Sequence, residues 1–593
     1  MTEYRAPIED IRFALDHVAN YAELEDWDSH SDASMETASA VLEEAAKLAQ
    51  DVLSPLNVVG DQQAAKMVGG QVVTPEGSQE AYNLLTEGGW IGLTAPEEFG
   101  GMNMPETLGA AVTELWHGAN VGFSLNVTLT YGAAAALMEH ASEEISTTYV
   151  PKLLEGKWTG TMNLTEPQAG SDLGALRCKA EKQSDGTYLI SGQKIFISYG
   201  DHDLAENIVH LVLARTPDAP AGSRGISLFV VPKFIPDENG NPGQRNQVTC
   251  VSLEHKLGLH ASPTAVLSFG DEGGATGWII GEENRGLAYM FVMMNRARFE
   301  VGIQGIGVAE RAYQRALAYA GDRIQGRPFD RESGVPIIGH PDVRRMLLMM
   351  KSQTEAARAL ALYAGKCMDG AHHHPDKDTR IHYDRSSQFL TPIVKGWSTE
   401  LATEIASIGI QVHGGLGFIE ETGAAQYLRD ARILSIYEGT TGIQANDLVF
   451  RKLLADEGAT AETLLNMIET DIAEQAGRDS VVEIATALDQ ALNMARKATG
   501  WILKNSNSPS VVAAGASPYL RLMGTLLGGW VSLRTASAAA MGLSEQSGSE
   551  RFLRSKLATA RFYADHVLCH ISGLAAEITQ GSASIIDPED ELL

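Results

Sequence analysis

Cysteine is scarce in this sequence. Its 593 residues include four cysteines, Cys178, Cys250, Cys367 and Cys569, which lie far apart and form no CxxC pair. We therefore expect neither a disulfide framework nor a structural zinc site, and a reducing cytoplasm is the simplest location for such a protein. The beginning of the chain has no basic segment followed by an apolar one, so no signal peptide is predicted.

Positive charge is scarce too. Lysine and arginine number 46 against 75 aspartates and glutamates, which gives a formal net charge of −29. Because affinity for nucleic acid depends on clustered lysines and arginines, no nucleic-acid partner is expected. The apolar stretch of residues 522–533 lies between two arginines and is shorter than the about 20 residues that cross a bilayer, so no membrane partner is expected either.

Several common catalytic signatures are absent. The sequence has no GxxxxGK[ST], HExxH or GxSxG motif, and no GxGxxG motif follows a predicted strand. P-loop, zinc-protease, serine-hydrolase and Rossmann functions therefore lose their usual support. His372, His373 and His374 precede a proline in a polar segment, where we predict a solvated loop and no metal site.

The spacing of apolar residues divides the chain into helical and β regions. Short β-branched and aromatic runs between residues 187 and 231 are separated by turn residues, with no room for crossover helices, and predict an antiparallel β domain. Helical periods on both sides predict an α+β fold, with an N-terminal α-helical domain, a middle β domain, a C-terminal four-helix bundle and an appended all-α domain. The predicted boundaries are 1–34 for an N-terminal helical extension, 35–160 for the N-terminal α domain, 161–281 for the β domain, 282–454 for the bundle and 455–593 for the appended domain.

Three short segments carry residues that suit a ligand. Residues 162–172 place hydroxyls and N–H groups in a Pro/Gly turn, which can bind an anion or the edge of a heterocycle. Residues 192–198 place Phe196 and Ser198 on one face of a strand, where the ring can stack on a flat group. In residues 411–418, glycines follow a helix and permit close approach of a ligand. Taken alone, each segment is more often an ordinary loop, core strand or helix end.

A fourth segment, residues 436–444, contains a candidate catalytic carboxylate. Glu438 stands among apolar neighbours on a glycine-containing turn that precedes a helix. Desolvation raises the pKa of such a carboxyl toward the range of a useful general base. The alternative is a glutamate that is favoured at a helix start by the helix dipole.

Together, the order and spacing of the four segments resemble the acyl-CoA dehydrogenase family of flavoproteins, over about residues 45–450. The resemblance implies that the cofactor is FAD and that the reaction is the α,β-dehydrogenation of an acyl-CoA thioester to the trans-2-enoyl-CoA. It also implies electron-transfer flavoprotein as the electron acceptor. Because members of the family reach the flavin of a neighbouring subunit, a homodimer or a dimer of dimers is implied as well.

The resemblance assigns roles to individual positions. Glu438 matches the catalytic base, whereas Ala297 stands where a few members carry the base, and Glu300 is a second candidate. The matching FAD contacts are Leu164, Thr165, Gly170, Ser171, Phe196, Ser198, Arg323, Gln411, Gly414, Gly415 and Thr440. The matching substrate contacts are Ser171, Asn295, Arg298 and Gly439.

Four positions depart from the family pattern. Phe196 and Ser198 stand where the family more often has tryptophan and threonine, which leaves the orientation of the flavin ring open. Asn295 replaces a common aspartate, and Gly442 replaces a common glutamine, so the pantetheine and adenine contacts are open too.

The start of the chain, residues 443–448 and the helical tail resemble a larger bacterial branch of the family. This branch includes enzymes that act on 3-methylmercaptopropionyl-CoA, an intermediate of dimethylsulfoniopropionate breakdown, and others that act on fatty acyl-CoAs. From the look of the termini we favour 3-methylmercaptopropionyl-CoA as the substrate and methylthioacryloyl-CoA as the product. A medium- or long-chain fatty acyl-CoA dehydrogenase of β-oxidation is the alternative, and so is an acyl-CoA oxidase, which uses the same residues. A non-enzymatic DNA-binding relative is disfavoured because acidic residues outnumber basic ones from 455 to 593.

Overall fold

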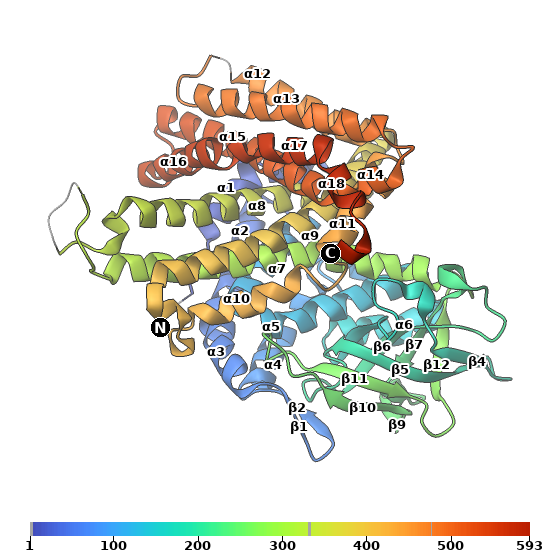
Figure 1. The fold of residues 1–593 in the computed structure, drawn as a ribbon. Coiled ribbons are helices and arrows are strands. Elements are labelled where there is room, and N and C mark those ends of the chain that lie inside the picture. Colours follow the sequence, from blue (N-terminus) through green and yellow to red (C-terminus); the bar gives the residue numbers. More distant parts are fainter. Residues whose placement is uncertain (1–3, 330–333, 476, 593) are drawn as a thin grey trace. The chain divides into compact units, whose positions relative to one another are not determined.

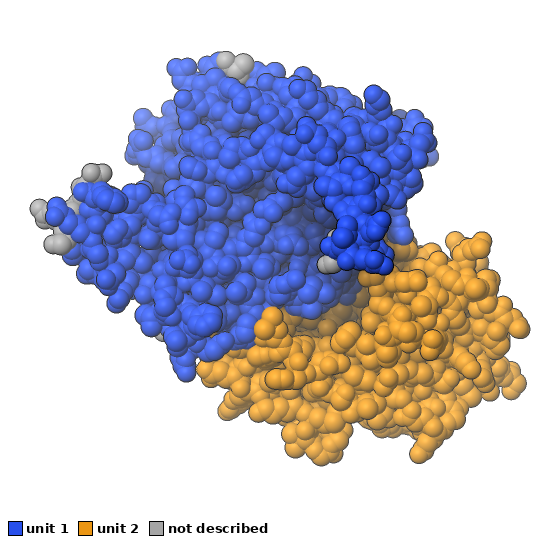
Figure 2. Space-filling model, in the orientation of Figure 1, with its two compact units in different colours: residues 1–46, 105–118, 298–593 blue, residues 47–104, 119–297 orange. Residues whose placement is uncertain are grey.

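The computed structural model describes residues 4–329, 334–475 and 477–592. The chain forms two compact units, which are coloured separately in Figure 2. Unit 1 comprises Met1–Ala46, Pro105–Gly118 and Arg298–Leu593, and unit 2 comprises Lys47–Met104 and Ala119–Ala297. Two long helices, α5 (Glu106–His140) and α7 (Gly286–Asp322), therefore contribute residues to both units.

Unit 2 is built around an eight-stranded β-sheet (Figure 1). The strands follow one another in the order β10-β11-β5-β12-β7-β6-β3, and β4 pairs with β5 at the side. Their bounds are β3 (Trp158–Asn163), β4 (Lys179–Lys182), β5 (Tyr188–Ser198), β6 (Asn207–Ala214), β7 (Ser227–Pro232), β10 (Val248–Leu253), β11 (Thr264–Phe269) and β12 (Ala275–Ile280).

One pair of strands in this sheet is parallel. β3 and β6 run in parallel register from Trp158 opposite Asn207 to Asn163 opposite Val212, while the other pairs in the sheet are antiparallel. The prediction of a middle β domain is thus confirmed, but the prediction that all its strands are antiparallel is wrong for β3 and β6. The chain between β3 and β6 contains a long loop and two strands, which lets it return to the same end of the sheet, as parallel pairing requires.

Two buried aromatic rings pack strand β5 against strand β7. Tyr188 on β5 and Phe229 on β7 are almost fully buried, and their ring centroids lie 5.0 Å apart. Each such ring stabilises the fold by roughly 1.5–3 kcal/mol through burial. Strand β5 therefore has little freedom to shift, and this matters because it carries one of the candidate ligand segments.

Helices and two small hairpins complete unit 2. The elements are a π-helical turn (Leu48–Leu53), α3 (Ser54–Gln63), the hairpin β1 (Lys66–Val68) and β2 (Gln71–Val73), α4 (Ser78–Glu87), α6 (Glu143–Leu154) and the pair β8 (Phe234–Pro236) and β9 (Pro242–Arg245). The hairpin β1–β2 interrupts a region that was predicted to be all helical.

The described part of unit 1 is built of helices, with one isolated β-bridge between Ile324 and Pro336. Helices α8 (Pro341–His373) and α9 (Lys377–His413) pack along each other, and α10 (Ala424–Leu434) packs on α9. After α11 (Thr441–Asn446) and a π-helical turn (Asp447–Leu453) come α12 (Ala459–Glu474), α13 (Val482–Lys504), α14 (Pro509–Ala514), α15 (Ala516–Glu545), α16 (Glu550–His566), α17 (Ile571–Gln580) and α18 (Ser582–Ile586). The predicted α+β fold with a bundle and extra C-terminal helices is confirmed.

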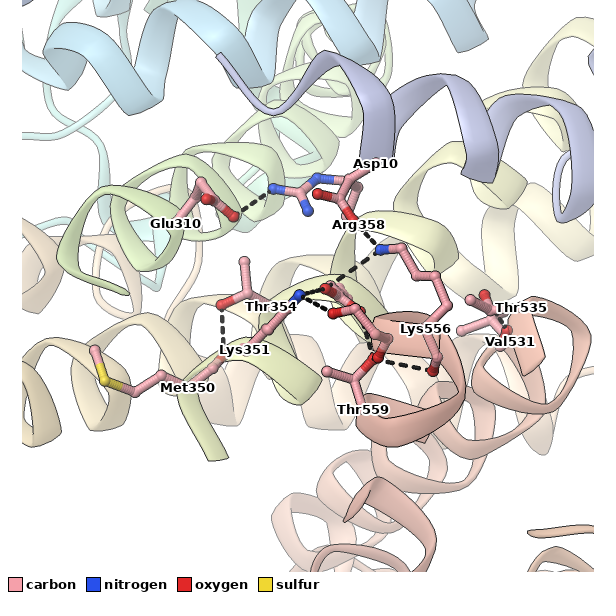
Figure 3. A network of polar contacts seen from close by, with 12 residues as sticks. Asp10, Glu310, Met350, Lys351, Thr354, Arg358, Val531, Thr535, Lys556 and Thr559 are labelled. Carbon is pink, nitrogen blue, oxygen red and sulfur yellow. Dashed lines mark hydrogen bonds and ion pairs between the residues drawn. The ribbon is translucent and has the colours of Figure 1, made fainter. Parts of the chain in front are cut away.

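A buried group of charges joins the first helix, the bundle and the C-terminal helices. Lys556 on α16 forms ion pairs with Asp10 on α1 (Ile8–His17) and, at 3.3 Å, with Glu355 on α8. Figure 3 shows Lys556 and Asp10 pointing toward each other across this contact. Because a buried ion must stay paired, these three parts of unit 1 are held together.

A second buried ion group lies within the bundle. Arg358 on α8 is 1% exposed, and its Nη2 donates to Glu114 of α5 at 2.6 Å and to Glu310 of α7 at 2.8 Å. Figure 3 shows Arg358 pointing toward Glu310. Loss of this arginine would leave both carboxylates without a compensating charge. We therefore expect a large decrease in the free energy of unfolding.

Helix α5 is long and apolar enough to cross a bilayer, and it is the single helix of this kind in the described part of the chain. However, 89% of its apolar window is buried inside the protein. Its composition is therefore accounted for by packing, as in any core helix.

The three consecutive histidines do not form the predicted loop. His372 and His373 lie in the last turn of α8, and the ring of His373 packs against that of His30 with a centroid distance of 4.4 Å. Within the described residues, no group of three or more His, Cys, Asp or Glu side chains is arranged to hold a metal ion. The helical period simply continues further than the polar sequence suggested.

Candidate active site

An exposed aromatic side chain stands on a bulge of β5. The register between β11 and β5 shifts between Ala265 and Leu267, so Ile195 and Phe196 together oppose one residue. Phe196 has φ = +60° and is 59% exposed. A non-glycine residue in the left-handed region costs about 1–3 kcal/mol and is typical of functional sites, and a bulge commonly redirects a side chain. The bulge thus presents a flat apolar ring to solvent.

The loop that follows β3 is fastened to this bulge. The N–H of Ile195 donates to the carbonyl of Thr165 at 3.0 Å, and Nζ of Lys194 donates to the carbonyl of Leu164 at 3.0 Å. Both contacts lie inside unit 2. The structure therefore brings the predicted FAD-binding residues of the loop next to those of the strand.

A buried ion pair underlies the loop. Lys194 and Glu166 are almost fully buried and 2.9 Å apart. Burial acts to raise the pKa of Glu166, but the ammonium of Lys194 and the N–H groups of Arg177 and Cys178 outweigh it and lower that pKa to about 2. The carboxylate stays ionised at neutral pH and fixes the start of the loop.

The surroundings of Phe196 fit a planar, partly polar cofactor. Gly170 and Ser171 are exposed, Thr165 and Ser198 are partly exposed, and no heavy atom lies within 4 Å of a Cβ built at Gly170. An aromatic face beside hydroxyls and an open glycine suits stacking together with hydrogen bonds to a heterocycle edge. These residues fit the isoalloxazine ring and the pyrophosphate of FAD.

In unit 1, Glu438 lies on a strained turn between α10 and α11. Glu438 has φ = +55° and Gly439 has φ = +95°. Nε2 of Gln444 donates to the carbonyls of both residues, at 3.1 Å and 3.3 Å, and Nζ of Lys395 donates to that of Gly439 at 2.6 Å. Side chains of α11 and α9 thus hold both carbonyls of the turn, and this offsets the strain of the left-handed backbone.

Electrostatics set the proton affinity of Glu438. Burial raises the pKa of its carboxyl to about 7, although Arg298 on α7 and Lys395 on α9 act to lower it. Burial likewise lowers the pKa of Lys395 to about 7, while Glu438 acts to raise it. A carboxylate with a pKa near 7 is a strong enough base to be useful, and about half of it is deprotonated at pH 7.

Neighbouring residues anchor the turn further. The hydroxyl of Tyr437 donates to Oε1 of Gln304 on α7, and Oγ1 of Thr440 accepts the N–H of Ile443 at 3.3 Å, which caps α11. In the described part of the chain, the N–H of Glu438 has no hydrogen-bond acceptor. This N–H is therefore available to a ligand carbonyl.

Arg298 and Glu300 point to different sides of α7, and the charge of Glu438 acts on Arg298. Arg298 is buried and also forms an ion pair with Asp447 at 3.9 Å. Glu300 lies two residues further along α7 and so points about 200° away around the helix axis. Asn295 is three residues before Arg298 and shares its face of the helix.

The remaining predicted FAD contacts gather at the ends of α7 and α9. The rings of Tyr319, near the end of α7, and His413, the last residue of α9, stack with centroids 4.5 Å apart. Arg323 follows α7, and Gly414, with φ = +61°, ends α9. No heavy atom lies within 4 Å of a Cβ built at Gly414 or Gly415, so this loop is open to a ligand.

Three residues of the site were missed by sequence reasoning. Lys395, Gln304 and Gln444 are each fully buried, and each contacts the Glu438 turn or its neighbour Tyr437. The one available signal was Lys395, an isolated lysine within the apolar run of residues 393–397. A lysine is seldom buried without a partner.

Known protein families match this chain along almost its whole length. The matches are to an acyl-CoA dehydrogenase N-terminal domain at residues 35–157, a middle domain at 161–271 and a C-terminal domain at 284–453. A further match, to an acetyl-CoA dehydrogenase C-terminal-like domain, covers residues 464–589.

Individual proteins resemble the chain over similar lengths. The 3-methylmercaptopropionyl-CoA dehydrogenase of Ruegeria pomeroyi is 49% identical over 98% of this chain and 99% of its own. A butyryl-CoA dehydrogenase of Syntrophomonas wolfei is 36% identical over 99% of both chains. An acyl-CoA dehydrogenase of Bacillus anthracis, solved in complex with FAD, has the same fold, with a TM-score of 0.74 and 19% identity over 99% of this chain and 94% of its own.

Proposed function

Because this chain belongs to the acyl-CoA dehydrogenase family, we propose that Glu438 is the base that removes the α-proton of its acyl-CoA substrate. The chain is an FAD-dependent oxidoreductase that acts on acyl-CoA thioesters. The observation that supports Glu438 most strongly is its carboxyl, which has a pKa of about 7 on a turn held by Lys395 and Gln444.

The reaction places two demands on the chain. The α-hydrogen of a thioester is weakly acidic, so it needs a base in the correct protonation state and a donor for the charge that develops on the carbonyl oxygen. Glu438 supplies the base through its carboxylate. Its N–H, which has no acceptor in the described part of the chain, is placed to donate to that oxygen.

The residues around the β5 bulge would hold the cofactor, and the loop after α9 would reach the cofactor of a neighbouring subunit, as the family resemblance implies. FAD, when bound, supplies the acceptor for the hydride that leaves the β-carbon of the substrate. The residues that we propose to hold it are Leu164, Thr165, Gly170, Ser171, Phe196, Ser198, Arg323, Gln411, Gly414, Gly415 and Thr440. Ser171, Asn295, Arg298 and Gly439 are proposed to contact the acyl-CoA.

We propose 3-methylmercaptopropionyl-CoA as the acyl substrate, with methylthioacryloyl-CoA as the product. The relative with that name is 49% identical over nearly the full length of both chains, against 36% for the butyryl-CoA dehydrogenase. A straight-chain fatty acyl-CoA is the second candidate because the latter relative also aligns over 99% of both chains.

An anaerobic titration tests both the reaction and the substrate. Purified holoenzyme is mixed with 3-methylmercaptopropionyl-, butyryl- and octanoyl-CoA, and the flavin absorbance at about 450 nm is followed. The thioether substrate should bleach the flavin fastest. If butyryl- or octanoyl-CoA has the higher kcat/KM, the substrate proposal is wrong, and if no acyl-CoA bleaches the flavin, the acyl-CoA activity itself is refuted.

Glu438→Gln tests the base. This change should slow bleaching by about 10²–10⁴-fold, the usual contribution of a general base. Glu457→Gln is a matched control because Glu457 also has φ = +55° and is exposed outside the site. Equal rates for the two variants would refute the assignment of Glu438.

Three further features belong to this proposal. Electron-transfer flavoprotein is proposed as the acceptor, and release of peroxide at the turnover rate would instead make the protein an oxidase. A homodimer or a dimer of dimers is proposed, since the loop at Gly414 is open to a second chain, and sedimentation measures it. A cytoplasmic location is supported by the absence of a disulfide among the four cysteines.

A further inference from the structure

Helix α15 of the appended domain packs directly on the part of α9 that holds the catalytic turn. Three of its residues, Leu520, Gly524 and Gly528, lie four positions apart and so share one face of the helix. The indole of Trp397 on α9 fills the space in which a side chain at 524 would lie, and together with the ring of Tyr563 it fills the space at 528. The two helices therefore approach closely, with Trp397 almost fully buried between them.

The same face of α15 reaches α11. A Cβ built at Gly396 would lie 2.8 Å from Cδ1 of Leu520 and 3.5 Å from Cβ of Gln444. Gly396, Leu520 and Gln444 thus meet at one point, and Leu520 is 1% exposed there. Helices α9 and α11 both contact α15.

The residues at this meeting point are those that hold the Glu438 turn. Lys395, the neighbour of Gly396, donates to the carbonyl of Gly439, and Gln444 donates to the carbonyls of Glu438 and Gly439. Both polar side chains are fully buried, so neither can change rotamer without displacing its packed neighbours. A shift of α15 would therefore be passed to the turn through three hydrogen bonds from two separate side chains.

We propose that the appended helical domain positions the catalytic base: Leu520 packs Gly396 and Gln444 in place, and Lys395 and Gln444 in turn fix the backbone of Glu438. Leu520, Lys395 and Gln444 are positioning residues, since none is proposed to touch the reacting atoms. This inference rests on the proposed function of Glu438 as the base. It gives the appended domain a catalytic purpose beyond general stability.

Two leucine variants of the full-length holoenzyme separate these roles. Leu520→Ala removes the contact with α9 and α11. Leu488→Ala is the matched control, because Leu488 is an equally buried leucine on α13 that lies near Gly529 on α15. Both variants should lower the melting temperature, since each leaves a cavity in the same domain.

The two variants should differ at the turn. We expect Leu520→Ala to speed amide hydrogen exchange of the 434–446 peptide by about tenfold or more, with Leu488→Ala within about twofold of the parent. We also expect Leu520→Ala to lower kcat by about tenfold with KM nearly unchanged, because the loss concerns the placement of the base and not substrate binding. Equal exchange and equal kcat in the two variants would overturn the proposal.

Lys395→Met provides a second route if Leu520→Ala fails to fold. It nearly keeps the length of the side chain and removes the donor to Gly439, so the 434–446 peptide should again exchange faster while the FAD content is retained. Unchanged exchange and kcat in this variant would overturn the proposal. Failure of Glu438 as the base would be seen separately, as an active Glu438→Gln, because hydrogen exchange needs no turnover.

Discussion

Lys395 and Glu438 shift each other's pKa in opposite directions, and burial brings both values to about 7. The charged groups that act on Glu438 are Arg298 from α7 and Lys395 from α9, and Glu400 also acts on Lys395. The protonation state of the base at neutral pH therefore depends on a lysine that is fully buried in the middle of a helix.

This relationship predicts a shifted pH profile for Lys395→Met. Because the ammonium lowers the pKa of Glu438, its removal raises that pKa, and a higher pH is needed to deprotonate the base. In the pH dependence of kcat, measured from pH 5 to 10, the acid limb should move to higher pH by about half to one unit. A shift toward lower pH would contradict the coupling, and Lys452→Met, a partly exposed change, should leave the limb in place.

Loss of Lys194 should destabilise the protein and release the cofactor loop. Lys194→Met leaves Glu166 buried without its cation, which costs about 3–5 kcal/mol of unfolding free energy. Urea unfolding measures this cost, and Lys179→Met, an exposed change nearby, should be within about 0.5 kcal/mol of the parent.

The same pair predicts an acid-sensitive component of stability. The pKa of Glu166 is about 2 in the folded state and about 4.3 in an unfolded chain, so its stabilisation is complete above the higher value. It is lost as the pH falls from about 4.3 to 2. Glu166→Gln should remove this part of the pH dependence in unfolding experiments between pH 2 and 5. An unchanged slope would show that Glu166 is not the group responsible.

The exposed ring on the β5 bulge should contribute to FAD affinity. Phe196→Ala removes a stacking surface worth about 1–3 kcal/mol for a heteroaromatic ring, so the FAD dissociation constant should rise by about tenfold. Phe196→Trp should restore it. Flavin fluorescence measures the release, and Val251→Ala, another exposed change on the sheet, should have no effect. Equal FAD affinity in Phe196→Ala and the parent would exclude the stack.

Removal of Arg358 should cost more stability than any exposed arginine. Arg358→Met leaves Glu114 and Glu310 buried without a cation, and we expect a loss of about 3–5 kcal/mol in urea unfolding. Arg345→Met, on an exposed part of the same helix, should cost less than about 1 kcal/mol. Similar losses for both variants would show that the buried group is not stabilising.

Much of this fold could be predicted because its patterns are local. Helical and strand periods, the glycine turns and the aromatic residue at 196 are all visible within about ten residues of sequence. The parallel pairing of β3 with β6 was not, since it depends on where the chain returns after some 40 residues of loop and strand.

The residues that hold the Glu438 turn could not be predicted from the sequence for a similar reason. Glu438 was visible because its turn has a recognisable local pattern. Lys395 was missed, because the carbonyl that it contacts belongs to Gly439, 44 residues later in the chain. The contact of Leu520 with Gly396 joins positions that are even further apart, and no periodicity encodes such a meeting.

The left-handed backbone of Glu438 means that a substitution that stabilises the fold would remove the proposed catalytic base. A glycine at this position would adopt φ = +55° freely and would remove a partly buried carboxyl, so Glu438→Gly should raise the unfolding free energy by about 1–2 kcal/mol. Glu457→Gly should gain stability from its backbone in the same way without loss of activity. A screen that selects only for heat resistance would therefore tend to discard the one carboxylate on which turnover is proposed to depend.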